Sequence, residues 1–160
     1  MKSYIKIARP DHWIKNLFIV PGVILANLLT DTAFTPEVGL RFIIGIMATC
    51  LIASANYVIN EWLDAKFDKY HPTKKYRPVV TGHMKFSLVM LEYAVLIAAG
   101  LGLSVLVSRY FLYMEIWLLV MGVLYNVEPI RTKDIAYLDV LTESINNLIR
   151  LLLGWFIVNN

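Results

Sequence analysis

Charged side chains are scarce in this sequence. Asp, Glu, Lys and Arg make up 17% of its 160 residues, whereas hydrophobic residues make up 58%. Soluble domains average about 25% charged and roughly 45–50% apolar residues, so this composition argues against a soluble domain and against a disordered chain. The apolar stretches are spread over the whole sequence. We therefore expect an all-α, polytopic transmembrane helix bundle that forms one domain over residues 1–160.

Cysteine is almost absent as well. Cys50 is the single cysteine in the sequence, which excludes a disulfide framework and a cysteine-based zinc site. The net charge is only +3, and the basic residues cluster where the topology of a membrane protein would put them, so we do not expect nucleic-acid binding. The sequence also contains no P-loop, no dinucleotide-binding glycine fingerprint and no nucleophile elbow.

Five apolar stretches are candidates for membrane-spanning helices, each of which needs about 20 residues. They cover residues 16–30 (with a start as early as Trp13), 42–60, 86–108, 110–127 and 135–158. Lys and Arg are concentrated before the first stretch, between the second and third, and between the fourth and fifth. The positive-inside rule therefore predicts a cytoplasmic N-terminus and two cytoplasmic polar segments. Glu92 and Glu115 fall near the ends of their stretches, where we expect their carboxylates to reach the membrane surface.

A polar stripe begins inside the second stretch and continues beyond it. Its residues are spaced by four, which places them on one face of a helix: Asn56, Asn60, Asp64 and Asp68. Carboxylates four residues apart repel each other, and a cation is their natural compensation. Oxygen ligands without cysteine favour Mg²⁺, which usually bridges one or two carboxylates to substrate phosphates.

Basic residues follow the stripe at Lys74, Lys75 and Arg77, where they would supply further contacts to phosphates. Pro72 and Pro78 indicate that these basic residues lie in a loop. The alternative is a solvated helix extension with surface ion pairs, followed by a loop whose charge only reflects topology. The four-residue spacing of the stripe favours the metal site over this alternative.

The fifth stretch carries a polar face of its own. Its members are Asp139, Glu143, Asn146, Asn147 and Arg150, whose offsets keep them on one side of a helix. Charged side chains at membrane depth usually point into a cavity or pair with one another. The face therefore predicts either a structural network between helices or the lining of a substrate cavity.

The stretch Asn60–Asp68 resembles the first aspartate-rich motif of the UbiA superfamily of intramembrane prenyltransferases, N-D-x-x-D-x-x-x-D. Glu61 stands where the family has its first Asp, which keeps a carboxylate but lengthens the side chain by one methylene. The continuation from His71 to Gly82 is also typical of the family. Residues 8–16 look like the start of the branch that contains decaprenyl-phosphate phosphoribosyltransferases, and residues 125–134 look like the family's loop after the fourth helix.

The resemblance implies an Mg²⁺-dependent transfer of phosphoribose from phosphoribosyl pyrophosphate to a polyprenyl phosphate. It also implies the roles of the polar residues. The metal ligands would be Asn60, Glu61, Asp64 and Asp68, with Asp64 and Asp68 catalytic; the phosphates would be held by Lys15, Lys74, Lys75, Arg77, Arg131 and Lys133; and the cavity would be lined by Asn56, Asp139, Glu143, Asn147 and Arg150. The expected location is a bacterial or archaeal cell membrane.

Two other functions stay open. One is transfer of a prenyl group from a prenyl diphosphate to an aromatic or other acceptor. The other is a non-catalytic half protein that binds lipid phosphate, because the resemblance implies nine helices and a second aspartate-rich motif, whereas this sequence holds about five helices and the first motif alone. We therefore expect either a fragment or a half protein that works with an oligomeric partner or a second half chain.

Overall fold

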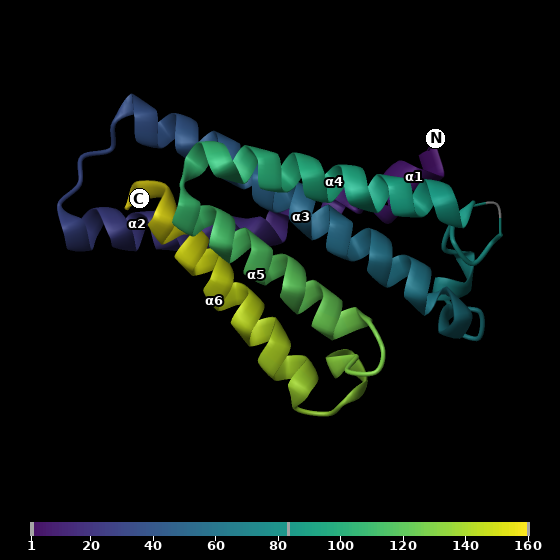
Figure 1. Ribbon diagram of the computed structural model, residues 1–160. Coiled ribbons are helices and arrows are strands. Elements are labelled where there is room, and N and C mark those ends of the chain that lie inside the picture. Colours follow the sequence, from purple (N-terminus) through teal and green to yellow (C-terminus); the bar gives the residue numbers. More distant parts are fainter. Residues whose placement is uncertain (1, 83, 160) are drawn as a thin grey trace.

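The computed structural model describes residues 2–82 and 84–159, and within these residues every regular element is a helix. The elements run back and forth between two ends of an elongated bundle (Figure 1). They are α1 (Lys2–Ile7), the 3-10 helix η1 (Pro10–Phe18), α2 (Ile19–Thr30), α3 (Pro36–Asp68), the 3-10 helix η2 (Lys74–Tyr76), α4 (Phe86–Val107), α5 (Arg109–Asn126), the 3-10 helix η3 (Thr132–Asp134) and α6 (Leu138–Val158). The all-α prediction is confirmed.

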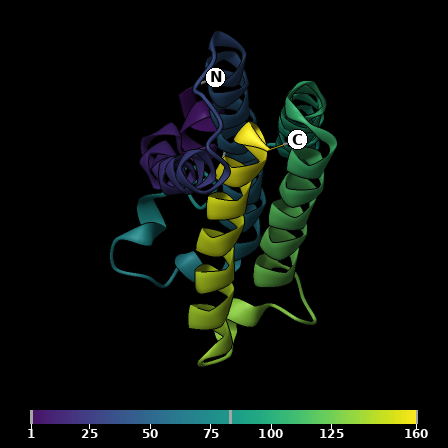
Figure 2. The same ribbon diagram turned by 90° about the vertical axis from the view of Figure 1, so that its left-hand side faces the viewer.

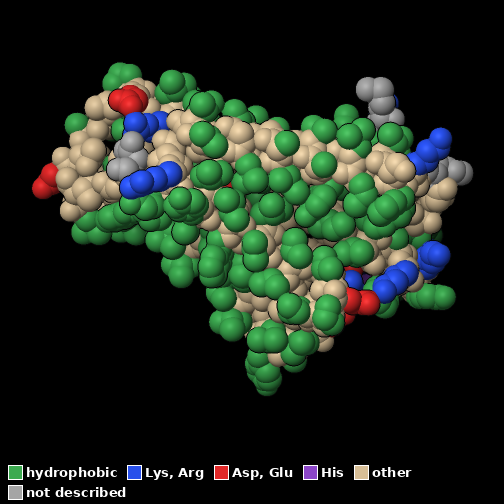
Figure 3. Space-filling view, viewed as in Figure 1, with side chains coloured by type: hydrophobic (Ala, Val, Ile, Leu, Met, Phe, Trp, Pro, Cys, Tyr) green, Lys and Arg blue, Asp and Glu red, His purple; other side chains and the backbone are tan. Residues whose placement is uncertain are grey.

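Four helical stretches are long and apolar enough to cross a membrane, judged by length and composition: Lys2–Thr30, Pro36–Asp68, Phe86–Val107 and Leu138–Val158. The 18-residue helix α5, which includes Arg109 and Glu115, brings the number of long helical segments to the five that the sequence predicts. On the face shown in Figure 3, apolar side chains cover the middle and charged side chains gather toward the two ends. This distribution fits a bundle whose middle lies in hydrocarbon.

The first two predicted spans differ from the observed helices. Regular α-helix begins only at Ile19 in the first span, because the nine residues from Pro10 to Phe18 form a 3-10 helix instead. The second span extends beyond 42–60 at both ends and forms the 33-residue helix α3. Its start is fixed by Pro36 at the first helical position and by the Thr35 hydroxyl, which accepts a hydrogen bond from the Val38 amide.

The length of α3 places the carboxylate end of the polar stripe, at Asp64 and Asp68, outside the hydrocarbon. A helix of this length extends roughly 50 Å, whereas the hydrocarbon core is about 30 Å thick. One end of α3 must therefore project from the membrane, and the end at Asp68 is the polar one. Segments that follow α3 and α5 lie at this same end, at residues 69–82 and 127–137 (Figure 1).

The helices pack as two close pairs, α3 with α4 and α2 with α6, and α5 contacts members of both pairs. Helix α3 lies against α4, and α6 lies between α2 and α5 (Figure 2). The crossing of α2 and α6 depends on two glycines, because a Cβ on Gly22 would overlap the carbonyl oxygen of Leu151 and a Cβ on Gly154 would overlap that of Ile19. Small residues allow such close backbone approach in membrane helices.

Glu115 does not reach the membrane surface, so that expectation is wrong. Its side chain is completely buried within the bundle, where one carboxylate oxygen accepts a hydrogen bond from the Thr49 hydroxyl of α3. A position near the end of an apolar stretch in the sequence does not reveal which way the side chain points. In α5 this residue faces α3, where the Thr49 hydroxyl is its partner.

Candidate functional site

A cavity of about 600 Å³ lies at the end of the bundle where the polar end of α3 meets the segments at residues 69–82 and 127–137. Five of its lining side chains are cationic and three are acidic. The lining residues are Arg9, Asn60, Asp64, Phe67, Asp68, His71, Lys74, Arg77, Tyr125, Arg131, Lys133 and Asp134. The two polar segments that the sequence predicts as site regions therefore do meet.

Asp64 is the centre of one group of polar contacts. Its Oδ1 atom accepts hydrogen bonds from Lys133 Nζ at 2.6 Å and from Arg131 Nη2 at 2.8 Å. Lys133 Nζ also donates to Asn60 Oδ1 at 2.7 Å and to Asn126 Oδ1 at 2.9 Å. These contacts hold the Lys133 ammonium of η3 against the polar stripe of α3.

Asp68, one turn further along α3, is held by the loop that follows. Arg77 donates a hydrogen bond from Nη1 to Asp68 Oδ2, and Lys74 Nζ lies 4.0 Å from the other carboxylate oxygen. Asp68 is buried, although it is the last residue of its helix. The basic loop is thus folded back over the end of the stripe, as a phosphate-binding loop requires.

Glu61 contacts a different set of groups. Its Oε2 atom accepts hydrogen bonds from Arg9 Nη2 at 3.0 Å and Nε at 3.2 Å, and it lies 4.0 Å from Arg77 Nε. The Glu61 side chain is buried behind these two arginines, which themselves line the cavity. Its expected role as a metal ligand stays a prediction, and its contacts support the positions of the two guanidinium groups.

Two of the cavity arginines have unusual backbone conformations. Arg9 has a φ of 48° and Arg131 has a φ of 34°, in the left-handed region that side chains other than glycine rarely adopt. Such conformations cost free energy and persist where the surroundings hold them in place. At both positions the side chain forms an ion pair with a carboxylate of α3, Glu61 for Arg9 and Asp64 for Arg131.

The excess of cationic groups suits a polyanion. Burial lowers the pKa of the Lys133 ammonium, and the hydrogen bond and charge of Asp64 oppose this shift. A phosphate group beside Lys133 would add a further negative charge that favours the ammonium form.

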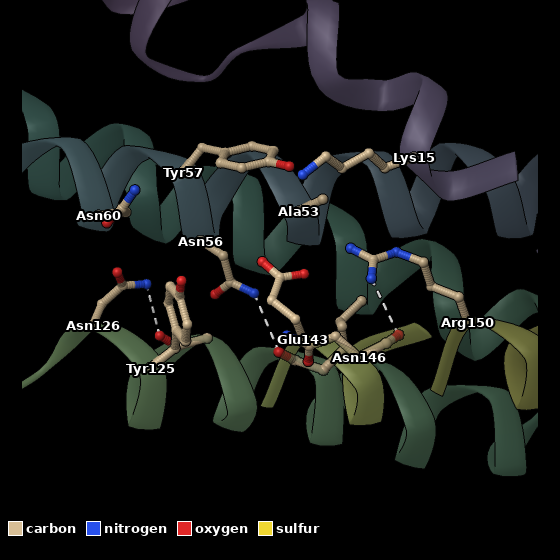
Figure 4. A pocket seen from close by; sticks show the side chains of 12 residues that line it. Lys15, Ala53, Asn56, Tyr57, Asn60, Tyr125, Asn126, Glu143, Asn146 and Arg150 are labelled. Atoms are coloured by element: carbon tan, nitrogen blue, oxygen red, sulfur yellow. Dashed lines mark hydrogen bonds between the residues drawn. The ribbon is translucent and has the colours of Figure 1, made fainter. Parts of the chain in front are cut away.

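A second, smaller pocket of about 90 Å³ adjoins the cavity and shares Asn60 and Tyr125 with it. It lies between α3 on one side and α5 and α6 on the other (Figure 4). Its polar lining residues are Lys15, Asn56, Tyr57, Asn60, Tyr125, Asn126, Glu143, Asn146 and Arg150. The predicted polar face of the fifth stretch thus lines a pocket through Glu143, Asn146 and Arg150.

Three predicted site residues lie elsewhere. Lys75 is exposed, with its ammonium 5.2 Å from the centre of the Tyr76 ring. Asp139 accepts a hydrogen bond from the Tyr125 hydroxyl at 2.8 Å, and Asn147 is half-buried on α6. Arg150 has a second role besides lining the pocket, because its Nε donates to Asn16 Oδ1 at 3.1 Å and so ties α6 to η1.

Sequence reasoning missed six polar members of these pockets: Arg9, Tyr57, His71, Tyr125, Asn126 and Asp134. Arg9 and the pair Tyr125–Asn126 lie inside the two short segments that resemble the family, which was a usable signal. No such signal marks Tyr57. A tyrosine near the end of an apolar stretch is as typical of a membrane interface as of a binding site.

Residues 2–82 and 84–159 contain no group of three His, Cys, Asp or Glu side chains that could hold a metal ion. Two carboxylates and one amide of the stripe nevertheless line the same cavity, at Asn60, Asp64 and Asp68. This donor set fits Mg²⁺, which takes hard oxygen ligands, keeps several waters and is commonly bound through one or two carboxylates together with substrate phosphates.

Comparisons with known proteins identify the family of the chain. The sequence model of the UbiA prenyltransferase family matches residues 18–160. A decaprenyl-phosphate phosphoribosyltransferase of Corynebacterium glutamicum is 32% identical over 104 residues, which cover 65% of this chain and 31% of the relative. A protein of Sinorhizobium fredii, called uncharacterized protein y4nM, is 27% identical over 154 residues, which cover 96% of this chain and 28% of the relative.

Solved structures show the same fold. A UbiA homolog from Archaeoglobus fulgidus bound to DMAPP and Mg²⁺ matches 99% of this chain with a TM-score of 0.80 at 17% identity, over 55% of its own length. A digeranylgeranylglyceryl phosphate synthase matches with a TM-score of 0.76 at 19% identity, over 53% of its length. The chain thus spans less than a third of these two curated relatives and about half of the solved chains. The family match and the apolar helices together identify an integral membrane protein.

Proposed function

This chain belongs to the UbiA prenyltransferase family, and on that premise we propose that it acts as a membrane-bound transferase on a polyprenyl lipid. The reaction we propose is the Mg²⁺-dependent transfer of phosphoribose from phosphoribosyl pyrophosphate to a polyprenyl phosphate. The observation that carries the proposal is the cavity at the polar end of α3, where five cationic side chains surround two carboxylates of one helical stripe. The relatives named decaprenyl-phosphate phosphoribosyltransferase support the choice of substrates.

The cationic side chains would hold the diphosphate. Arg77, Arg131 and Lys133 each contact a carboxylate of the stripe, so each already points its charge toward the centre of the cavity. They would stabilise the negative charge that builds up on pyrophosphate as it leaves. Mg²⁺ held by Asn60, Asp64 and Asp68 would share this charge and polarise the leaving group.

Binding would exchange partners rather than create unpaired charges. The guanidinium and ammonium groups would pass from the carboxylates to the phosphate oxygens, while the carboxylates would pass to the metal ion. Because buried charges are costly unless they are paired, this exchange keeps every charge compensated. Departure of pyrophosphate leaves an oxocarbenium-like centre at the ribose. The phosphate of the polyprenyl phosphate would then attack that centre, with the lipid chain lying between helices.

A second candidate is transfer of a prenyl group from a prenyl diphosphate to an acceptor. The Archaeoglobus fulgidus homologs bound to DMAPP or GPP together with Mg²⁺ favour it. It would use the same cavity, because both reactions begin with a bound diphosphate. A third candidate is a non-catalytic half protein that binds lipid phosphate and works with a second chain, which the partial coverage of the relatives favours.

We also propose that the cavity opens to the cytoplasm of a bacterial or archaeal cell. The N-terminal segment and both loops at the cavity end carry most of the Lys and Arg residues, and positive segments stay on the cytoplasmic side.

The test uses membranes from cells that produce the whole protein, with Asp64→Asn and Asp68→Asn variants as matched controls. We expect label from ribose-labelled phosphoribosyl pyrophosphate to enter the lipid fraction only with Mg²⁺ and only with the wild-type protein. Transfer from a labelled prenyl diphosphate to an aromatic acceptor would support the second candidate. Retained phosphoribosyl transfer in either variant would contradict the metal site, and no transfer from any donor would leave the non-catalytic role.

A further inference from the structure

The small pocket beside the cavity is polar although it lies among membrane helices. It adjoins the proposed phosphate site, and the two share Asn60 and Tyr125. Its volume of about 90 Å³ is large enough for ordered water or for one small hydroxylated group. The side chains of Glu143, Asn56 and Asn146 lie close together on one side, and those of Lys15 and Arg150 lie nearby (Figure 4).

Two amide oxygens of this pocket lack partners. Asn56 Oδ1 and Asn146 Oδ1 are buried and accept no hydrogen bond from any part of the chain that the structure describes. The Asn56 amide is oriented by its nitrogen, which donates to the Leu118 carbonyl oxygen at 3.2 Å. A flipped amide would set two oxygens against each other, so Oδ1 must be the free atom. Gly122 makes room for this amide, since a Cβ there would overlap it.

These oxygens require hydrogen-bond donors. A buried acceptor without a partner costs about 1–3 kcal/mol, so a ligand that leaves both unpaired would bind poorly. A prenyl chain has no donor to offer. Hydroxyl groups donate to amide and carboxylate oxygens, including the carboxylate of Glu143, and also accept from the cationic groups of Lys15 and Arg150.

We propose that this pocket binds the hydroxyl groups of a sugar whose diphosphate lies in the adjoining cavity. The pocket would then discriminate a sugar diphosphate from a prenyl diphosphate, with Asn56, Asn146 and Glu143 as the specificity-determining residues. The inference rests on the proposed function, because it takes the larger cavity as the diphosphate site.

Calorimetric titration of the purified full chain in lipid nanodiscs tests the sugar subsite apart from the phosphate site. The ligands are phosphoribosyl pyrophosphate, inorganic pyrophosphate and dimethylallyl diphosphate, each with Mg²⁺. We expect the sugar diphosphate to bind at least about tenfold more tightly than the other two, which corresponds to about 1.4 kcal/mol. Asn146→Leu should remove about that factor for the sugar diphosphate and leave the affinity for pyrophosphate unchanged.

Ser144→Ala is the matched control, because Ser144 is an exposed residue of the same helix whose hydroxyl donates to the Val140 carbonyl oxygen. Glu143→Ala provides a second variant should Asn146→Leu fail to fold, since Glu143 is exposed and its loss should also weaken only the sugar diphosphate. Equal affinity for the sugar diphosphate and pyrophosphate, or tighter binding of dimethylallyl diphosphate, would overturn the sugar subsite while the phosphate site stands. Absence of binding by all three ligands would overturn both.

Discussion

Lys133 and Asp64 are 69 positions apart in the sequence, yet the Lys133 ammonium lies 2.6 Å from Asp64 Oδ1. This contact joins the segment between α5 and α6 to the end of α3 and turns two separate polar segments into one site. Removing one partner of a buried ion pair leaves the other charge uncompensated. The pair therefore organises the cavity as well as supplying charge to it.

Asp64→Asn should have opposite effects on anion binding with and without metal. The substitution removes one of the three acidic side chains of the cavity and leaves its five cationic ones. Pyrophosphate binding in the presence of EDTA should therefore become tighter, whereas the gain in affinity that Mg²⁺ provides to the wild-type protein should disappear. Titration calorimetry on the wild-type and variant proteins measures both. A variant that keeps the full Mg²⁺-dependent gain would exclude Asp64 as a ligand.

Glu61→Gln distinguishes a metal ligand from a support for arginines. Glu61 pairs with Arg9 and approaches Arg77, and so holds both guanidinium groups in place. Because its loss removes this support, pyrophosphate binding should weaken several-fold. The Mg²⁺ concentration for half-maximal binding should stay unchanged, and it would rise if Glu61 were a ligand. Glu37→Gln makes the same chemical change on an exposed residue at the far end of α3 and should alter neither quantity.

Gly154→Ala should destabilise the bundle by about 1–3 kcal/mol, the usual range for overpacking. The new Cβ would overlap backbone atoms of α2, which cannot move aside without shifting the whole helix. Gly102→Ala is the control, because nothing in the described structure lies within 4 Å of a Cβ at that helical position. Thermal unfolding in detergent should show a lower midpoint for Gly154→Ala and an equal or higher one for Gly102→Ala. Equal midpoints for the two variants would contradict the observed helix crossing.

Cysteine labelling tests the orientation. Cys50 is buried, so the natural chain should react poorly with a membrane-impermeant maleimide. Lys75→Cys and Ala33→Cys place an exposed thiol in loops at opposite ends of α3. In intact cells only Ala33→Cys should be labelled, and Lys75→Cys should react after the cells are opened. The reverse pattern would place the cavity on the outer side.

The polar stripe was predictable because it depends on spacing within a single helix. A period of four residues places Asn56, Asn60, Asp64 and Asp68 on one face, and α3 continues to Asp68. The partners of these residues could not be predicted in the same way. The contacts of Lys133 with Asp64 and of Arg9 with Glu61 depend on how helices far apart in the sequence pack.

The direction in which a polar side chain of an apolar helix points could not be predicted from the sequence either. Glu92 and Glu115 occupy similar places in their stretches, but only the packing of α5 against α3 reveals that Glu115 contacts Thr49. The start of the first helix was misplaced for a related reason. Apolar composition marks a segment as membrane-embedded, yet it does not distinguish the 3-10 helix η1 from an α-helix.

The cavity at the end of α3 is proposed to bind a diphosphate together with Mg²⁺. Titration of the purified wild-type chain with inorganic pyrophosphate, with Mg²⁺ and then with EDTA, tests it most directly, because no acceptor lipid and no turnover are needed. We expect pyrophosphate to bind at least tenfold more tightly with Mg²⁺, and the binding to weaken as the salt concentration rises. Failure to bind pyrophosphate under either condition, by a protein that remains folded, would contradict it.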